Sequence, residues 1–545
     1  YKRDFYRATW IFTALDAGFW TAMNIRPNWL KHILSFVFTI YYLIFADQAV
    51  ERVRRVRACI TLEHMRVSWN KADTPIIRFI TYFDRPRIAM QHRIELPRRD
   101  AHLPPVGIEV FFHGSKEAYA SATRCILHTH GGGFVAMSPR CHEEYLRRWA
   151  IQTGVPIFSI DYKKAPEFPY PYAIEECFDV YEQIRETNGG CLGLEGWFHA
   201  RDNTPKAPLR IIGTGDSAGG NIITALAYKI IESPKPLVPL AGLVLVYPSL
   251  DFNMRCWIEP KNADLVRNES AHSLPSLAET RDHLGHKSPL AFGPDTVSAW
   301  RRIRSQSLQE RTGARVASLK EKSARLMMTS QASYTADRML TLDMLRAMVI
   351  MYLGPHRHPD FEREYYVAPI VAPEHLIAQL PPVYIICGER DPLVDDSIRF
   401  AARIRQAKLQ LWKRKHAATD AAGFDEDLHV RLKVVEGASH AFLHMVALYP
   451  PTKTIIGLLG GWFEELLYGD VASMPMPGRE GISGQQRGKA ADDLPAGSLS
   501  ADERQHIEHW QRSSLVHEAE LMDRRNQHIY NTHVLTFEHN HATTA

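Results

Sequence analysis

The chain has 545 residues, of which 45% are hydrophobic and 23% are charged, and its net charge is +4 at pH 7. This composition excludes a disordered chain and a polytopic membrane protein, and the small net charge argues against a nucleic-acid partner. The seven cysteines are widely spaced, so neither a disulfide framework nor a structural zinc motif is expected.

The first segment, residues 1–60, is basic and contains two apolar stretches, over residues 8–25 and 33–46. The second stretch is uncharged and would cover about 21 Å as a helix, short of a roughly 30 Å hydrocarbon core. Three interpretations stay open: a single spanning helix, a shallow hairpin with both ends on one side, or two core helices of a soluble domain. We expect membrane association, with the arginines of residues 52–57 keeping the rest of the chain cytosolic.

Residues 61–104 are expected to form a helical or cap segment and a linker. Beyond them, short apolar runs alternate with longer amphipathic stretches, which predicts an α/β fold with a mostly parallel, doubly wound sheet over residues 105–470. In such sheets the chemistry gathers at the carboxyl ends of the strands. The expected strands are 125–127, 156–160, 209–212, 243–246, 383–387 and 432–435.

Two glycine-rich motifs follow expected strands. Gly-Asp-Ser-Ala-Gly at residues 215–219 matches the nucleophile elbow G-x-S-x-G, which makes Ser217 the candidate nucleophile. His-Gly-Gly-Gly-Phe at residues 130–134 brings backbone N–H groups close to a developing oxyanion. We assign Gly131, Gly132 and Ala218 as the oxyanion donors, and His130 as a brace for the loop.

A serine nucleophile needs a base and an acid, and both candidates follow later strands. Asp391 comes directly after the strand 383–387, with Asp395 and Asp396 as local competitors. His440 lies in Ser-His-Ala-Phe after the last strand. The chain order serine, acid, histidine is that of α/β-hydrolase triads, so we assign Asp391 as the acid and His440 as the general base.

With these motifs in place, residues 125–450 resemble the hormone-sensitive lipase family of α/β-hydrolases. The Ala-Pro-Glu element at residues 165–167 is similar to that family as well. The resemblance implies the α/β-hydrolase fold with a helical cap, the triad Ser217, Asp391 and His440, and no metal or organic cofactor. It also implies that Glu167 is structural.

The chain departs from a compact esterase of this type in two places. A Ser/Arg-rich insert at about residues 255–335 separates the nucleophile from the acid and is expected to be flexible. Arginine stands three residues before several of its serines, so Ser305, Ser307 and Ser318 are candidate phosphorylation sites for a regulatory kinase. The segment 471–545 is expected to be a polar tail with a helix near residues 501–525.

These features predict a serine carboxylic-ester hydrolase, a lipase or esterase that acts on lipid esters such as acylglycerols or sterol esters. The apolar, basic N-terminal segment favours work at a membrane or lipid-droplet surface, with the endoplasmic reticulum or a lipid droplet as the location. One alternative is a membrane-anchored hydrolase of small esters or amides that resembles the arylacetamide deacetylases. Another is a non-catalytic ligand receptor on the same fold, which the presence of His440 disfavours.

Overall fold

The computed structural model describes residues 1–57, 60–70, 81, 85–200, 203–252, 330, 337–416, 423–469, 497–518 and 520–521. Nearly all of them belong to the larger of two compact units, which comprises Tyr1–Phe252 and Arg338–Val516. The insert expected at about residues 255–335 falls almost wholly outside the described residues. The three candidate phosphorylation sites, Ser305, Ser307 and Ser318, fall outside them too.

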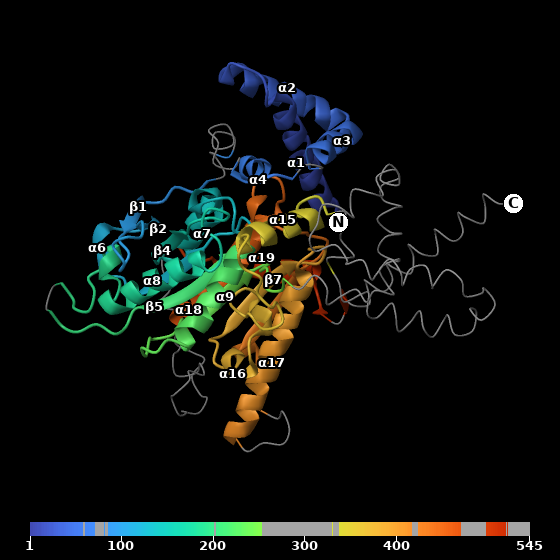
Figure 1. The fold of residues 1–545 in the computed structure, drawn as a ribbon. Coiled ribbons are helices and arrows are strands. Elements are labelled where there is room, and N and C mark those ends of the chain that lie inside the picture. Colours follow the sequence, from blue (N-terminus) through green and yellow to red (C-terminus); the bar gives the residue numbers. More distant parts are fainter. Residues whose placement is uncertain are drawn as a thin grey trace, which may run out of the picture. The chain divides into compact units, whose positions relative to one another are not determined.

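A nine-stranded sheet forms the centre of the larger unit, in the order β1-β2-β4-β3-β5-β6-β7-β8-β9 (Figure 1). The strands from β4 to β8 pair in parallel, whereas β1, β2 and β9 pair antiparallel at the two sides. The strands are β1 Met90–Leu96, β2 Val106–Phe112, β3 Arg124–Thr129, β4 Ile157–Asp161, β5 Arg210–Asp216, β6 Gly242–Val246, β7 Val383–Gly388, β8 Val430–Val435 and β9 Leu515–Val516.

The six expected strands are β3 to β8, and the predicted fold class is confirmed. Their apolar runs are continuous because helices bury both faces of the parallel part of the sheet. The sheet also extends beyond residues 105–470 on both sides. Strand β1 has mostly half-buried and exposed side chains, and β9 has only two residues, so neither has an apolar run that sequence reasoning could detect.

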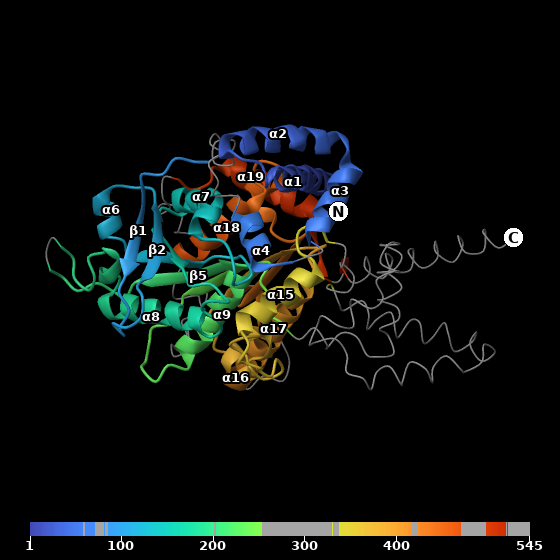
Figure 2. The ribbon, with the colours of Figure 1, turned by 45° about the horizontal axis from the view of Figure 1, so that its top comes forward.

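Helices cover the two faces of the sheet, as Figure 2 shows. The helices α7 and α18 pack together on one face, where the indole N–H of Trp149 donates to the carbonyl of Ile456 at 3.1 Å. The other face carries α8, α9 and α17. The bounds are α6 Lys116–Ala120, α7 Glu143–Thr153, α8 Tyr172–Thr187, α9 Ala218–Ile231, α16 Glu374–Ile377, α17 Val394–His416, α18 Pro451–Tyr468 and α19 Ala501–Ser514.

The N-terminal segment forms three helices, α1 (Arg3–Ala22), α2 (Asn28–Ile44) and α3 (Ala46–Arg57), which pack against one another. Their shared core contains Ala14, Ala17, Tyr42, Ala49 and Val53. The start of α1 is fixed to the loop after β8, because the backbone N–H of Lys2 donates to the carbonyl of Gly437 at 3.1 Å.

Among the helices of the described residues, none combines the length and the hydrophobicity that a membrane crossing requires. The basic cluster after the second apolar stretch lies in α3, and two of its arginines are engaged within the protein. Arg52 donates to the carbonyl of Trp20, and Arg57 donates to the carbonyl of Arg338, each at 2.8 Å.

Candidate active site

The candidate nucleophile lies on the sharp turn between β5 and α9. Ser217 has φ 53° and ψ −119°, a backbone conformation that L-residues rarely adopt. The turn is possible because the residues two positions before and after the serine are glycines: a Cβ on Gly219 would lie 2.0 Å from the carbonyl oxygen of Thr129. The elbow therefore presents the Ser217 hydroxyl beyond the carboxyl end of the strand, as the motif predicts.

The structure brings the three predicted triad residues together. His440 Nε2 lies 2.9 Å from Ser217 Oγ, and His440 Nδ1 lies 2.9 Å from Asp391 Oδ2. A carboxylate can only accept, so Nδ1 carries the proton and Nε2 faces the hydroxyl with its lone pair. This is the tautomer that a general base needs.

The acid of this group is held in place by its own loop. Asp391 is fully buried, and its second oxygen accepts the N–H of Leu393 at 2.8 Å. The competitor Asp396 has different contacts, because its Oδ2 accepts the N–H groups of Leu250 and Asp251 at 2.8 and 3.0 Å. Burial raises the pKa of Asp396 well above its usual range. The sequence favoured Asp391 over its competitors Asp395 and Asp396, and Asp391 is the residue that contacts His440.

The glycine loop corrects one predicted role. The N–H of Gly131 donates to Asp216 Oδ1 at 2.9 Å, so it fixes the loop and is not open to a substrate oxygen. Within the described part of the chain, the N–H groups of Gly132 and Ala218 have no protein acceptor. These two donors remain for an oxyanion. The contact that decides between the glycines comes from a residue far away in sequence, so the motif alone could not reveal it.

Asp216 is a site residue that sequence reasoning missed. It is the variable position of G-x-S-x-G and is buried, and its Oδ1 also accepts the hydroxyl of Tyr145 at 3.0 Å. Burial alone would raise the pKa of Asp216, but charge interaction with His142 and hydrogen bonds from neighbouring histidines hold the pKa well below the usual range. Asp216 is therefore an ionised carboxylate directly before the nucleophile.

The bracing role expected for His130 agrees with its contacts. Its Nδ1–H donates to the carbonyl of Gly131 at 2.7 Å, and its ring stacks on Tyr162 with 4.4 Å between centroids. Burial, with a further contribution from the nearby Lys164 charge, lowers the pKa of His130 to about 3. His130 is consequently neutral at physiological pH.

Two helices outside the sheet cover the glycine loop. From α4 (Leu62–Trp69), Arg66 donates to both oxygens of Glu167 at 2.7 and 2.5 Å, and to the carbonyl of Val135 at 2.9 Å. From α15 (Leu342–Leu353), Tyr352 stacks on Phe134 with 3.8 Å between centroids. Glu167 thus connects α4 to the loop, and α15 contacts the same loop through Tyr352.

Comparison with known proteins shows which sequences resemble this chain. A family model described as the alpha/beta hydrolase fold matches residues 126–288 and 314–420. Hormone-sensitive lipase of Ictidomys tridecemlineatus is 26% identical over 429 residues, which cover 60% of this chain and 51% of that protein. The chain thus spans about half the length of the first curated relatives it matches.

Two further relatives are shorter proteins. An esterase of Acinetobacter venetianus is 36% identical over 138 residues, which cover 25% of this chain and 39% of the esterase. Arylacetamide deacetylase of Oryctolagus cuniculus is 23% identical over 373 residues, which cover 66% of this chain and 83% of that protein. The chain therefore belongs to the α/β-hydrolases, and hormone-sensitive lipases are among its curated relatives.

Proposed function

We propose that this chain is a serine hydrolase that cleaves carboxylic esters. The observation that carries the proposal is the unbroken line of contacts from Ser217 Oγ through His440 to Asp391, with 2.9 Å at each step. The relatives named hormone-sensitive lipase and esterase support the same chemistry. A non-catalytic receptor would have no need for a histidine base at the serine, so this contact favours hydrolysis.

In the proposed reaction, Ser217 Oγ attacks the ester carbonyl carbon while His440 Nε2 takes the hydroxyl proton. The N–H groups of Gly132 and Ala218 stabilise the negative charge that forms on the carbonyl oxygen. His440 then gives the proton to the leaving alcohol, and an acyl-enzyme remains. A water molecule, deprotonated by His440, releases the carboxylic acid and restores the serine. Asp391 holds the imidazole in the required tautomer throughout.

A serine-directed probe tests this proposal directly. Ser217→Ala should abolish labelling by a fluorophosphonate and lower turnover of a p-nitrophenyl ester by about 10⁵-fold or more. Ser233→Ala, at a serine beyond the far end of α9, is the matched control and should label like the wild type. Wild-type turnover by a folded Ser217→Ala protein would contradict the proposed mechanism.

We infer further that the substrates are lipid esters, such as acylglycerols or sterol esters, taken from a membrane or lipid-droplet surface. Helix α2 supports this inference, since Phe36, Ile40 and Ile44 lie four residues apart and are 60%, 46% and 72% exposed. A row of large exposed apolar side chains is typical of a helix that lies in a lipid interface. Such a helix would favour the shallow hairpin among the three interpretations of this segment, with the catalytic body on the cytosolic side.

Vesicle flotation separates this inference from the catalytic proposal. Changing Phe36, Ile40 and Ile44 to Ser should abolish flotation with phosphatidylcholine vesicles and lower activity on emulsified triacylglycerol, while turnover of a soluble p-nitrophenyl ester is unchanged. The control changes Phe198 and Val238 to Ser, which are also exposed but lie elsewhere. Undiminished flotation of the α2 variant would contradict the surface role and leave the hydrolase proposal intact.

The alternative substrate class is a small ester or amide, as the name of the rabbit relative indicates for that protein. A screen with acetanilide, p-nitrophenyl esters, diacylglycerol, triacylglycerol and cholesteryl ester distinguishes the two classes. Phosphorylation of Ser305, Ser307 or Ser318 by a kinase that prefers basic sequences stays a prediction, and mass spectrometry of the purified protein after kinase treatment would test it.

A further inference from the structure

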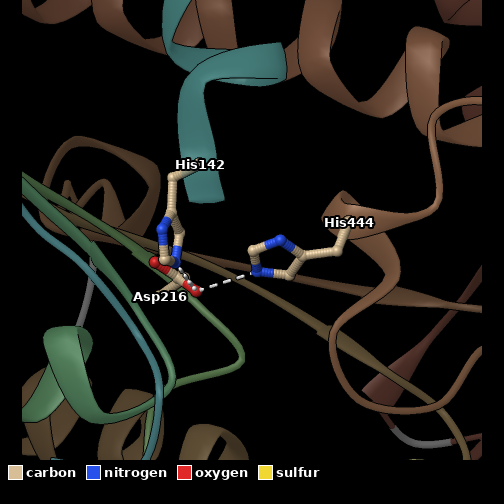
Figure 3. Close-up of side chains that lie close together, drawn as sticks. All are labelled: His142, Asp216 and His444. Carbon is tan, nitrogen blue, oxygen red and sulfur yellow. Dashed lines mark ion pairs between the residues drawn. The ribbon is translucent and has the colours of Figure 1, made fainter. Parts of the chain in front are cut away.

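A second group of polar side chains lies beside the triad and takes no part in the proposed reaction. His142 ends the 3₁₀ turn Pro139–His142, Asp216 ends β5, and His444 ends the 3₁₀ turn Phe442–His444. Figure 3 shows both imidazole rings directed at the same carboxylate. The three potential ligand atoms lie within 4.8 Å of one another, and each histidine Nε2 is 3.5 Å from Asp216 Oδ2.

These approaches are not ordinary hydrogen bonds. A distance of 3.5 Å exceeds the roughly 2.7–3.2 Å of a normal N–H···O bond. His142 is fully buried, yet its Nε2 has no hydrogen-bond partner among the described residues. Its Nδ1–H donates to the carbonyl of Ser138 at 2.9 Å, so in the neutral ring Nε2 presents a lone pair. Either a cation or a second ring proton must therefore lie between this nitrogen and the carboxylate oxygen.

The spacing and the surroundings fit a bound cation. Two ligand atoms about 2.1 Å from a tetrahedral zinc ion lie about 3.4 Å apart, close to the 3.5 Å between each histidine nitrogen and Asp216 Oδ2. The three ligand atoms together lie within 4.8 Å of one another, so the two imidazole rings would move toward each other when the ion binds. A metal-binding imidazole usually donates its other N–H to a backbone carbonyl, as His142 does to Ser138. Gly131 and Tyr145 hold the second oxygen of Asp216, which orients Oδ2 toward the histidines.

A third imidazole nearby is already engaged. His128 Nε2 is 3.6 Å from Asp216 Oδ1, on the other side of the carboxylate, and its Nδ1 contacts Ser159 Oγ at 2.7 Å. The ligand set is therefore two imidazole nitrogens and one carboxylate oxygen. Such a set suits zinc-like transition metals better than calcium or magnesium, which prefer oxygen ligands.

We propose that His142, Asp216 and His444 bind one divalent transition-metal ion of the zinc class. The ion would connect three segments that surround the triad, since Asp216 precedes the nucleophile and His444 follows His440 by four residues. The His444 side chain is 18% exposed, which gives the ion a route of entry. The role is structural: the ion would hold the histidine loop against β5 and would not touch the substrate.

Metal binding to the full chain tests the proposal without any activity measurement. The chelated protein is titrated with Co²⁺, and its visible absorption is recorded. One Co²⁺ per chain with the strong absorption of a four-coordinate nitrogen and oxygen site is expected, together with a saturable rise in melting temperature of roughly 1–3 °C under Zn²⁺. Weak, octahedral-type absorption or no bound ion would overturn the proposal.

Variants locate the ion. His142→Gln and His444→Gln should each lower affinity for the ion at least about 10-fold and remove the thermal shift, whereas His429→Gln, a histidine beside β8, should change neither. Equal metal affinity in folded His142→Gln and His444→Gln proteins would also overturn the site. Should either variant fail to fold, the Co²⁺ spectrum of the wild type still decides. Failure of this proposal leaves the hydrolase proposal unaffected.

Discussion

Replacing Asp391 by Asn isolates the function of the acid. The N–H of Leu393 donates to one carboxylate oxygen, so the side-chain carbonyl of Asn would take this position and its NH₂ group would face His440 Nδ1. Nδ1 would then have to accept, and the imidazole proton would move to Nε2, opposite the Ser217 hydroxyl. In that tautomer His440 cannot take the serine proton. We expect kcat to fall by about 10⁴-fold, which corresponds to about 5.5 kcal/mol of activation free energy.

The assay is steady-state turnover of a p-nitrophenyl ester, with thermal melting to verify folding. Asp396→Asn is the matched control, because this buried acid in the first turn of α17 accepts backbone N–H groups that Asn can also satisfy. Its turnover should stay within about threefold of the wild type, since among the described residues its carboxylate bonds to Leu250 and Asp251 and not to the imidazole. If Asp391→Asn melts like the wild type and keeps more than a tenth of its turnover, the tautomer argument is refuted.

Three further predictions concern the stability of the residues around the active site. Gly219→Ala should lower the free energy of unfolding in urea denaturation by at least about 3 kcal/mol, because its Cβ would overlap a backbone carbonyl of β3. The control is Gly461→Ala in α18, where the Cβ meets nothing within 4 Å. This change should raise the free energy of unfolding by up to about 1 kcal/mol. His130→Gln should flatten the pH dependence of the free energy of unfolding. The pKa of His130 is about 3 in the folded protein and about 6.5 in the unfolded chain, so between these values only the unfolded chain binds the proton. The contribution of this residue to stability is therefore fully present above about pH 6.5 and is lost as the pH falls, by at most about 1.4 kcal/mol per pH unit. Arg66→Ala should lower the free energy of unfolding by about 1–2 kcal/mol. Glu167→Gln should lower it by less, because Arg66 also donates to backbone carbonyls.

Each of these has an outcome that would contradict it. Equal stability of the two glycine variants would show that the elbow can relax. An unchanged slope in His130→Gln between pH 5 and 7 would assign the acid sensitivity to another buried histidine, such as His128, whose pKa burial also lowers. Matching losses for the Arg66 and Glu167 variants would mean that the ion pair alone holds α4.

The sequence revealed the parallel sheet because the strands from β3 to β8 are buried on both faces and therefore appear as apolar runs. The order of the triad followed from the same logic, since each motif stands directly after a strand. The remaining contacts depend on residues from segments distant in sequence. Asp216 fixes Gly131, and His142 and His444 meet at Asp216, but no local pattern connects these residues.

The N-terminal segment shows the other limit of sequence reasoning. Apolar stretches at residues 8–25 and 33–46 have the same composition whether a helix is buried or exposed. In the structure, α1 uses its small residues, such as Ala14 and Ala17, to approach the other helices closely. Helix α2 leaves most of its large side chains exposed. Only the packing partners, which lie on other helices, separate the two cases.

The pairing of β9 with β8 has a practical consequence for producing the protein. A recombinant fragment cut at residue 470 would lack the strand that covers Val434 and Val435, leaving their backbone groups open at the edge of the sheet. Because that edge leads straight into the loop with His440, shortening the C-terminus should promote aggregation and loosen the catalytic histidine together. A fragment for crystallisation should therefore extend through residue 516 and keep the N-terminal helices, since Lys2 bonds to the loop after β8 and Arg66 to the glycine loop.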